Sequence, residues 1–263
     1  MRVYSLSVKK GEPLYPQTLQ TDYWFWHKGY EVIPFQLEQL DQGEFDHVLQ
    51  YESDDIIFIG SVGAMKKAFQ RAGFAPVENL EFPSELQAYY GRKISIETFE
   101  TVQDWIENEP SKLPVHIKPV KEHKLFKGCL VEKFRDLIPL SHVPGDSPVY
   151  VQEKIDIVSE WRATILRSKV LNVAHYSGNP IVFPDAQVIR KAVAEYTTSP
   201  IGYSIDFGIT TSGQTVIIEV NDGYALGNYG VRGYMYTALV ECRWREIAGL
   251  PDNMMGMDFG AVI

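Results

Sequence analysis

The chain has 263 residues, of which 45% are hydrophobic, and it carries a formal net charge of −9. This length and composition suit a globular protein with one large or two small domains and a sizeable core. The acidic balance argues against a general nucleic-acid binder, which needs a basic surface to displace counterions from phosphates. No apolar run approaches the ~20 residues that span a bilayer, and the N-terminal MRVYSLSVKK lacks a signal peptide's apolar segment, so a cytoplasmic protein without membrane attachment is expected.

Cysteine and histidine give no sign of a metal site. Cys129 and Cys242 lie far apart in the sequence and in no CxxC spacing, so we expect neither a disulfide framework nor a zinc site. Both are interpreted as packing residues. The six histidines are scattered without an HExxH pattern, so histidine-based metal chemistry is not expected.

The first 110 residues are predicted to form a small α/β unit. Strands are expected at 3–8, 31–35 and 56–59, with helices at 18–28 and after Gly60, and Pro34 places the second strand at a sheet edge. The aromatic residues at 23–26 are expected in a core or domain interface. Alternating strands and helices favour a parallel, Rossmann-like unit, although a dinucleotide fingerprint and the ending of a Walker A loop are both missing.

A domain boundary is expected near residue 110. Residues 83–108 are predicted to be mostly helical, with Ser95 as an N-cap, and the sequence Glu109-Pro110-Ser111 ends that segment. The predicted domains are therefore an N-terminal unit at 1–110 and a larger region at 111–263.

The larger region opens with a predicted strand at 115–120 and a lysine-rich loop. Lys118 projects from the end of the strand, and the loop at 121–127 carries Lys124 before a second strand with Gly128. Because an ammonium is a compact and movable point charge, these lysines could fold over phosphates. The alternative is that they are ordinary surface lysines.

Two further strands offer polar groups. The first ends in Gln152, Glu153, Lys154 and Ile155, whose backbone could face a planar base. The next contains the sequence EWR at 160–162, in which the acid and the guanidinium share a face. They could recognise phosphate, or they could form an ion pair on a wet sheet face, contributing roughly 0.2–1 kcal/mol.

A hairpin at 203–221 carries the strongest candidate ligands. Side chains alternate across a strand, so Asp206 on the first arm can meet Glu219 and Asn221 on the second, across a turn at 211–213. Val216, Ile218 and Val220 are expected on one face, and Ile217, Glu219 and Asn221 on the other. Glu219 lies within the apolar run VIIEV, and buried carboxylates are usually paired or bound to a cation. Two carboxylates and an amide suit Mg²⁺, whereas the alternative is a face that is merely solvated.

The glycine-rich loop after this hairpin is expected to form a substrate pocket. It contains Asn228, Tyr229 and Arg232, all placed to contact a substrate, because loops at strand ends often carry function. Helices are predicted on either side of the hairpin, at 184–198 with Asp185 as its cap and at 236–248.

The order of these motifs resembles that of the ATP-grasp ligases. The resemblance covers residues 115–232, through VHIKPV, KLFKG, VQEKI, EWR, Asp206 and the pair Glu219 and Asn221. The chain looks most like the RimK-related, R2K-type branch found in bacteria and phages. This resemblance implies α/β and α+β architecture, with an ATP-grasp fold whose two α+β subdomains grip ATP, preceded by the small α/β domain.

The resemblance also assigns roles. Arg162 would lie near the γ-phosphate and acyl group, and Lys118 at the α-phosphate, so these two are the expected catalytic residues. Asp206, Glu219 and Asn221 would hold magnesium. The remaining residues expected to bind ATP are Lys124 on the covering loop, Gln152, Glu153, Lys154 and Ile155 at the adenine hinge, and Glu160 at the ribose. This sequence departs from the pattern in its less glycine-rich covering loop and in Gln152, where some members carry an acid.

The implied activity is an ATP-dependent carboxylate–amine ligase that makes an amide through an acylphosphate. The acyl substrate and amine acceptor would be an amino acid, a peptide or a protein, with ATP and Mg²⁺ required. Two alternatives stay open: a noncatalytic nucleotide-binding or interaction protein with the same fold, and a small-molecule kinase that uses the same cleft.

Overall fold

The computed structural model describes residues 1–7, 16–120, 125–254 and 260, and its chain forms two compact units. The first unit contains Met1–Tyr89, Val158–Ile209 and Gly213–Ile263, and the second contains Tyr90–Ile157 and Thr210–Ser212. The chain passes from the first to the second unit near residue 90, whereas the sequence analysis places a domain boundary near 110.

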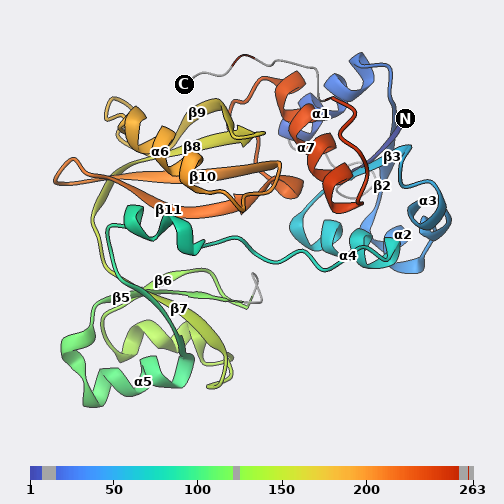
Figure 1. Ribbon diagram of the computed structural model, residues 1–263. Coiled ribbons are helices and arrows are strands. Elements are labelled where there is room, and N and C mark those ends of the chain that lie inside the picture. Colours follow the sequence, from blue (N-terminus) through green and yellow to red (C-terminus); the bar gives the residue numbers. More distant parts are fainter. Residues whose placement is uncertain (8–15, 121–124, 255–259, 261–263) are drawn as a thin grey trace. The chain divides into compact units, whose positions relative to one another are not determined.

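A parallel three-stranded sheet forms one part of the first unit (Figure 1). Its strand order is β2-β1-β3, so Pro34 lies on an edge strand as predicted, where its missing N–H costs no ladder bond. The alternation of strands and helices predicted for this region is confirmed. The elements are β1 Arg2–Leu6, α1 Pro16–His27, β2 Glu31–Phe35, α2 Leu37–Gln42, α3 Asp46–Tyr51, β3 Ile56–Ile59, α4 Val62–Ala72 and the 3₁₀ helix η1 Ser84–Tyr89.

An antiparallel sheet with strand order β11-β10-β8-β9 forms the other part of the first unit. Helix α6 lies on one face of this sheet (Figure 1), with the predicted cap Asp185 accepting a hydrogen bond from the Gln187 N–H at 2.7 Å. The elements are β8 Ile157–Leu166, β9 Lys169–Gly178, α6 Ala186–Glu195, β10 Gly202–Thr210, β11 Thr215–Asp222, the 3₁₀ helix η4 Gly223–Ala225 and α7 Gly233–Ile247.

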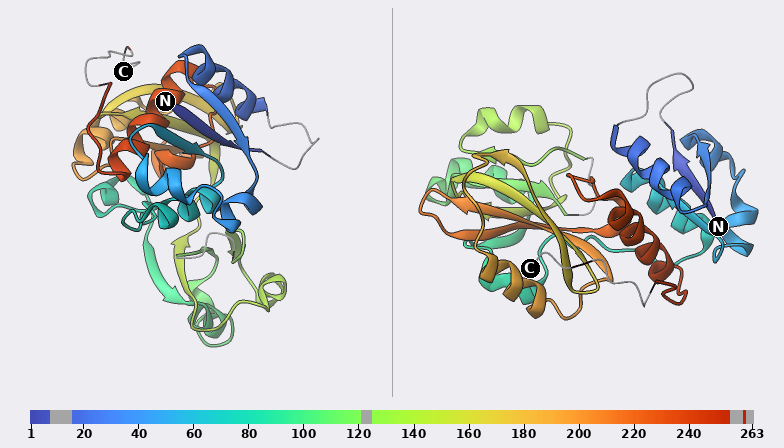
Figure 2. Two further views of the ribbon diagram at one scale, coloured as in Figure 1. Left: turned by 90° about the vertical axis from the view of Figure 1, so that its right-hand side faces the viewer. Right: turned by 90° about the horizontal axis from the view of Figure 1, so that it is seen from above.

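Helix α7 joins the two parts of the first unit. It runs beside α1 (Figure 2), and its Trp244 is buried against Phe58 of β3, with ring centroids 5.9 Å apart. A buried polar link adds to this apolar contact, because the Tyr30 hydroxyl donates to Glu241 of α7 at 3.0 Å. The parallel sheet and the helix that follows the antiparallel hairpin therefore share one core.

The aromatic run of α1 only partly meets the prediction that it is buried. Phe25 is fully buried and Trp24 packs near Tyr234 of α7, with ring centroids 6.0 Å apart. Tyr23 and Trp26, however, are 52% and 65% exposed. An α-helix has about 3.6 residues per turn, so four consecutive aromatic residues point in all directions around the helix and cannot all face one core.

The second unit is a four-stranded antiparallel sheet of order β4-β7-β5-β6 with one helix. Its core contains Phe99, Val102 and Trp105 from the helix, packed with strand residues such as Ile117 and Val149. The elements are β4 Ile94–Thr98, α5 Phe99–Asn108, the 3₁₀ helix η2 Pro110–Lys112, β5 Val115–Pro119, β6 Cys129–Val131, the 3₁₀ helix η3 Phe134–Leu140 and β7 Pro148–Glu153.

The prediction that 83–108 is mostly helical is wrong for its middle part. Residues 94–98 form β4, which pairs with β7, and the helix begins at Phe99 with Thr98 as its N-cap instead of Ser95. Ile96 is 57% exposed on this strand. The alternation of ISIET suits a strand, and pairing with a partner about 50 residues away overrides the local helical spacing.

Both cysteines are free, as predicted, and pack against apolar neighbours. Burial raises the pKa of the Cys242 thiol to about 12, so it stays protonated and unreactive near neutral pH. Among the described residues no helix is long and apolar enough to cross a bilayer. The cytoplasmic location stays a prediction.

A substitution at Gly223 tests the close packing between the end of β11 and the start of β10. A Cβ atom there would lie 2.4 Å from the Gly202 carbonyl oxygen, which is backbone and cannot rotate away. We expect Gly223→Ala to lower the free energy of unfolding by about 1–3 kcal/mol in urea denaturation. Gly63→Ala in α4 is the matched control, because a Cβ at Gly63 meets nothing within 4 Å. Equal stability of the two variants would contradict this account of Gly223.

Candidate functional site

The residues expected to bind ATP, metal and substrate fall into two groups, one in each compact unit. Lys118, Gln152, Glu153, Lys154 and Ile155 belong to the second unit. Lys124 lies outside the described residues. The group in the first unit contains Glu160, Arg162, Asp206, Glu219, Asn221, Asn228, Tyr229 and Arg232.

A buried ion pair forms the centre of the group in the first unit. The Arg162 Nε and Nη2 atoms of β8 donate to Asp206 Oδ1 and Oδ2 of β10, both at 2.7 Å. The two residues are only 8% and 2% exposed. A planar guanidinium matches a carboxylate in this two-bond geometry, and the pair is short because both groups are charged. Sequence analysis placed Glu160 as the acid beside Arg162, whereas the structure gives Asp206 this position.

The hairpin brings its three predicted ligands together. Glu219 is the cross-strand partner of Asp206, and Asn221 is the partner of Ser204 on the same face. The Asn221 Nδ2 atom lies 3.1 Å from Glu219 Oε1 and 3.4 Å from Asp206 Oδ2. One neutral amide therefore bridges two carboxylates.

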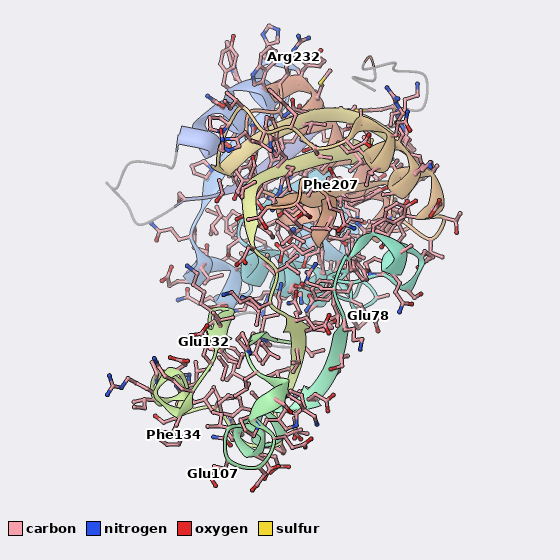
Figure 3. All side chains as sticks on the ribbon, turned by 90° about the vertical axis from the view of Figure 1, so that its left-hand side faces the viewer. Glu78, Glu107, Glu132, Phe134, Phe207 and Arg232 are labelled. Atoms are coloured by element: carbon pink, nitrogen blue, oxygen red, sulfur yellow. The ribbon has the colours of Figure 1, made fainter. Side chains whose placement is uncertain are left out.

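A β-bulge at Asp206/Phe207 sets the faces of this hairpin. Asp206 is opposite Glu219, but Phe207 is opposite Ile217, so Ile218 is the extra residue. The prediction that Ile217 shares a face with Glu219 is therefore wrong, because the bulge interrupts the alternation. Ile217 instead shares the face of Phe207, which lies enclosed among side chains (Figure 3). The bulge turns Asp206 and Glu219 toward one face while the apolar residues after it stay in the core.

Burial and neighbouring carboxylates shift the pKa values of groups at this site. Burial raises the pKa of Asp206, and Glu219 and Glu160 raise it further, while Arg162 opposes the shift. Burial also raises the pKa of Tyr176, with additional contributions from Asp206 and Glu160. Three carboxylates thus act on a region in which Arg162 is the cation paired to Asp206.

The donor set of this site fits a divalent cation. Two carboxylates with an amide between them are typical hard-oxygen donors for Mg²⁺, and a rotation of the Asn221 amide would present its oxygen in place of its nitrogen. No group of three or more His, Cys, Asp or Glu residues arranged to hold a metal occurs in the part of the chain that the structure describes. Two carboxylates and one amide make only a partial ligand shell, which Mg²⁺ would complete with water and phosphate oxygens.

Tyr229 connects this charged cluster to a cavity in the same unit. Its ring lies over the Arg162 guanidinium, with 4.3 Å between the ring centroid and Cζ. It also contacts Tyr176 at a centroid distance of 5.3 Å. The cavity has a volume of about 470 Å³, and both Asn228 and Tyr229 line it. Of the three predicted substrate residues, Arg232 is exposed at the start of α7 (Figure 3) and is not among the residues lining the cavity.

The group in the second unit lies on β5 and at the end of β7. Lys118 is half-buried on β5, opposite Tyr150 of β7. The Gln152 side chain is buried, and its Oε1 accepts hydrogen bonds from Arg92 Nε and Nη2 at 3.0 and 2.6 Å. Lys154 is exposed, with its Nζ 3.8 Å from Asp156.

Two residues at these sites, Arg92 and Tyr176, were not predicted from the sequence. Arg92 has no motif around it, and it reaches Gln152 only because β4 pairs with β7. Tyr176 reaches the charged cluster through a bulge, since Glu160 is opposite Ser177 and Trp161 is opposite His175. No local signal in the sequence marks either contact.

Solved structures of three proteins share this fold over most of the chain. The RimK domain ATP-grasp protein from Sphaerobacter thermophilus DSM 20745 has a TM-score of 0.53 and 16% identity, covering 92% of this chain and 100% of that one. The macrocyclase MdnC from Microcystis aeruginosa MRC, bound with precursor peptide MdnA, has a TM-score of 0.52 and 10% identity, with coverages of 91% and 99%. N5-Carboxyaminoimidazole synthetase from Staphylococcus aureus has a TM-score of 0.52 and 11% identity, with coverages of 95% and 78%.

At these identities the similarity establishes the fold alone, which is the ATP-grasp fold expected from the sequence. Residues 89–239 match the family described as ATP-grasp domain, R2K clade family 2. This match spans more than half of the chain, so the protein belongs to that family. No curated protein sequence matches the chain.

The buried ion pair can be tested by a double-mutant cycle in urea denaturation. Arg162→Ala leaves the Asp206 carboxylate buried without its partner, so we expect a loss of about 3–5 kcal/mol in the free energy of unfolding. Adding Asp206→Ala should recover part of that loss, with a coupling energy of about 1–3 kcal/mol. The exposed pair of Lys67 and Asp41 is the control and should show a coupling of about 0–1 kcal/mol. Equal coupling for both pairs would contradict the structural role of the buried one.

Tyr236 of α7, which lines the cavity, should make the free energy of unfolding depend on pH in the alkaline range. Burial raises the pKa of Tyr236 to about 12, above about 10 for an unfolded tyrosine, so the folded state keeps the proton longer. Its contribution to stability is complete below about pH 10 and is lost as the pH rises through about 12. Tyr236→Phe should therefore reduce the loss of unfolding free energy over that range by about 2–3 kcal/mol. Tyr51→Phe, at a side chain that is 75% exposed, is the control and should leave the pH profile unchanged. An unaltered profile in Tyr236→Phe would show that this hydroxyl does not titrate late.

Proposed function

We propose that the protein is an ATP-dependent carboxylate–amine ligase. It forms an amide or peptide bond through an acylphosphate, with an amino acid, a peptide or a protein as substrate. The observation that carries this proposal is the cluster of the buried Arg162 and Asp206 with the half-buried Glu219 and Asn221 in a member of the ATP-grasp family.

The proposed chemistry uses charge neutralisation rather than a nucleophilic side chain. A substrate carboxylate oxygen attacks the γ-phosphorus of ATP, and the bond from that phosphorus to the ADP oxygen breaks. An amine nitrogen then attacks the acyl carbon, the carbon–oxygen bond to phosphate breaks, and the nitrogen loses a proton. Such transfers depend on positioning and on electrostatic stabilisation of the phosphoryl group, which suits a buried arginine.

Arg162 is the side chain that we assign to the transferred phosphoryl group. Its guanidinium is fixed by Asp206 and by the Tyr229 ring, so its orientation is set before substrate arrives. A fixed cation in a site shielded from water stabilises developing negative charge more than a mobile one at the surface.

We assign Asp206, Glu219 and Asn221 to magnesium. A bound Mg²⁺ would neutralise phosphate charge and orient the triphosphate. The support is the closeness of the Asp206 and Glu219 carboxylates and the position of the Asn221 amide between them. The Asn221 amide orients Glu219 toward Asp206, which holds two oxygen donors at one place.

We assign the group in the second unit, together with Glu160, to the nucleotide. Lys118 would neutralise the α-phosphate, and the backbone at 152–155 would pair with the adenine edge. The support is the half-buried position of Lys118 on β5 and the position of this backbone, where β7 ends at Glu153. Arg92 would keep the Gln152 side chain turned into the unit through its two hydrogen bonds.

Two of the structures that share the fold are named as enzymes. One is a macrocyclase bound with a precursor peptide, and another is a carboxyaminoimidazole synthetase. Their identities of 10% and 11% leave the substrate of this chain open.

Glu219→Gln tests the assignment of the metal ligands. Removing one formal charge without changing shape should lower ADP release, with ATP, Mg²⁺ and mixed amino acids and peptides, by at least about a hundredfold. Glu107→Gln is the matched control, on the exposed surface of α5 (Figure 3), and should keep full activity. The assay combines ADP release with mass spectrometry of the products.

Three outcomes would contradict the proposal. Full turnover by a folded Glu219→Gln protein would show that Glu219 is not a metal ligand of the active site. A stable phosphorylated product without an amide would identify a small-molecule kinase. ATP binding without ADP release, across all pools of carboxylates and amines, would identify a noncatalytic nucleotide-binding protein.

A further inference from the structure

The cavity lies entirely within the first unit, at the carboxyl edge of its parallel sheet. Leu6 is the last residue of β1, and Ile59 is the last residue of β3. Side chains from α1, from the loop after β11 and from α7 complete the wall. Ligands of open parallel sheets bind at this edge, because the loops that leave the strands converge there.

The residues just before α4 form part of the cavity wall. Gly60 and the N-cap Ser61 line the cavity directly before α4, which has 11 residues. The first N–H groups of a helix have no intrahelical acceptor. The Ser61 side chain accepts from one of them, the Ala64 N–H, at 3.3 Å, and those of Val62 and Gly63 precede it in the first turn. These groups and the helix dipole favour a carboxylate.

Asn228 is a second and independent indication of a ligand. It is only 4% exposed and lines the cavity, and neither its Nδ2 nor its Oδ1 has a hydrogen-bond partner within the described ranges. Leaving a buried donor and a buried acceptor unpaired is costly, so a ligand that offers both an acceptor and a donor would satisfy the side chain.

Apart from Thr21, the other walls of the cavity are apolar or aromatic. No charged residue is among the described residues that line it, so a charged ligand side chain would find no counterion there. Most of the lining is made by Leu6, Ile59, Tyr224, Leu226, Tyr229, Tyr236 and Val240. An apolar body therefore fits this cavity better than a charged one.

We propose that the cavity binds a free amino acid with a large, uncharged side chain, as the small substrate of the ligase. This inference rests on the proposed function. The carboxylate lies at the start of α4, Asn228 pairs with the polar head group, and the side chain fills the apolar part. The Tyr229 ring separates this amino acid from Arg162, since it lines the cavity and contacts the guanidinium.

Calorimetric titration of the full chain without ATP tests this assignment directly. L-Phenylalanine should bind at one site, and L-phenylalaninamide, which lacks the carboxylate, should bind about tenfold or more weakly. L-Glutamate and L-lysine, which would bring an unpaired charge into the apolar part, should be weaker by a similar factor.

Two variants separate binding from folding. Asn228→Leu preserves the shape of the side chain but removes its donor and acceptor, and it should weaken L-phenylalanine binding by about tenfold or more. Ala225→Phe keeps Asn228 and fills the cavity, so it should abolish binding. Asn108→Leu, at an exposed position in α5, is the matched control and should bind as the unmodified protein does. Thermal unfolding of each variant confirms that it is folded.

The outcomes distinguish this inference from the proposed function. If L-phenylalanine and L-leucine fail to bind while ADP release with another substrate persists, the amino-acid assignment is wrong and the ligase stands. Tighter binding of adenosine than of any amino acid would also overturn it. If amino acids bind in the expected order but no amide forms with any carboxylate or amine, the ligase is wrong, and the cavity cannot be its substrate site.

Discussion

The buried contact between the Arg162 guanidinium and the Asp206 carboxylate is the constraint that the other site residues must meet. Two hydrogen bonds of 2.7 Å fix both groups deep in the sheet, where neither is solvated well. Glu219 lies opposite Asp206 and adds negative charge beside this pair, which raises the pKa of Asp206 further. The position therefore favours a divalent cation together with phosphate. The cation would neutralise the carboxylates, and the phosphate would neutralise the cation and the arginine.

Sequence patterns were sufficient where the contacts are local. The two arms of the hairpin, its turn and the meeting of Asp206 with Glu219 follow from the alternation of side chains along two adjacent strands. Pairing between distant strands left no such trace. The pairing of Arg162 with Asp206 could not be predicted, because nothing local in the sequence indicates that β8 lies beside β10. Bulges also prevent prediction from alternation. An inserted residue moves each side chain beyond it in that strand to the opposite face of the sheet, as happens at Ile217.

The cavity shows the same limit at a larger scale. Asn228 and Tyr229 were expected to contact substrate because they follow a strand in a glycine-rich loop, and both line the cavity. The residues at the ends of β1 and β3 could not be assigned, because they meet this loop only after α7 packs on the parallel sheet. Tyr229 then links the two regions, because its ring lies over the Arg162 guanidinium and the residue also lines the cavity. The substrate would thus lie on the opposite side of the Tyr229 side chain from the cation that we assign to the phosphoryl group.

A metal at the hairpin is the central claim, and it can be located directly. Crystals of the full chain grown with a non-hydrolysable ATP analogue and Mn²⁺, which replaces Mg²⁺ and scatters anomalously, would show the metal as a single strong peak. The account predicts that this peak lies within coordination distance of Glu219 and of a phosphate oxygen, with Arg162 facing the γ-phosphate. A peak remote from Asp206, Glu219 and Asn221, with nucleotide bound, would contradict it.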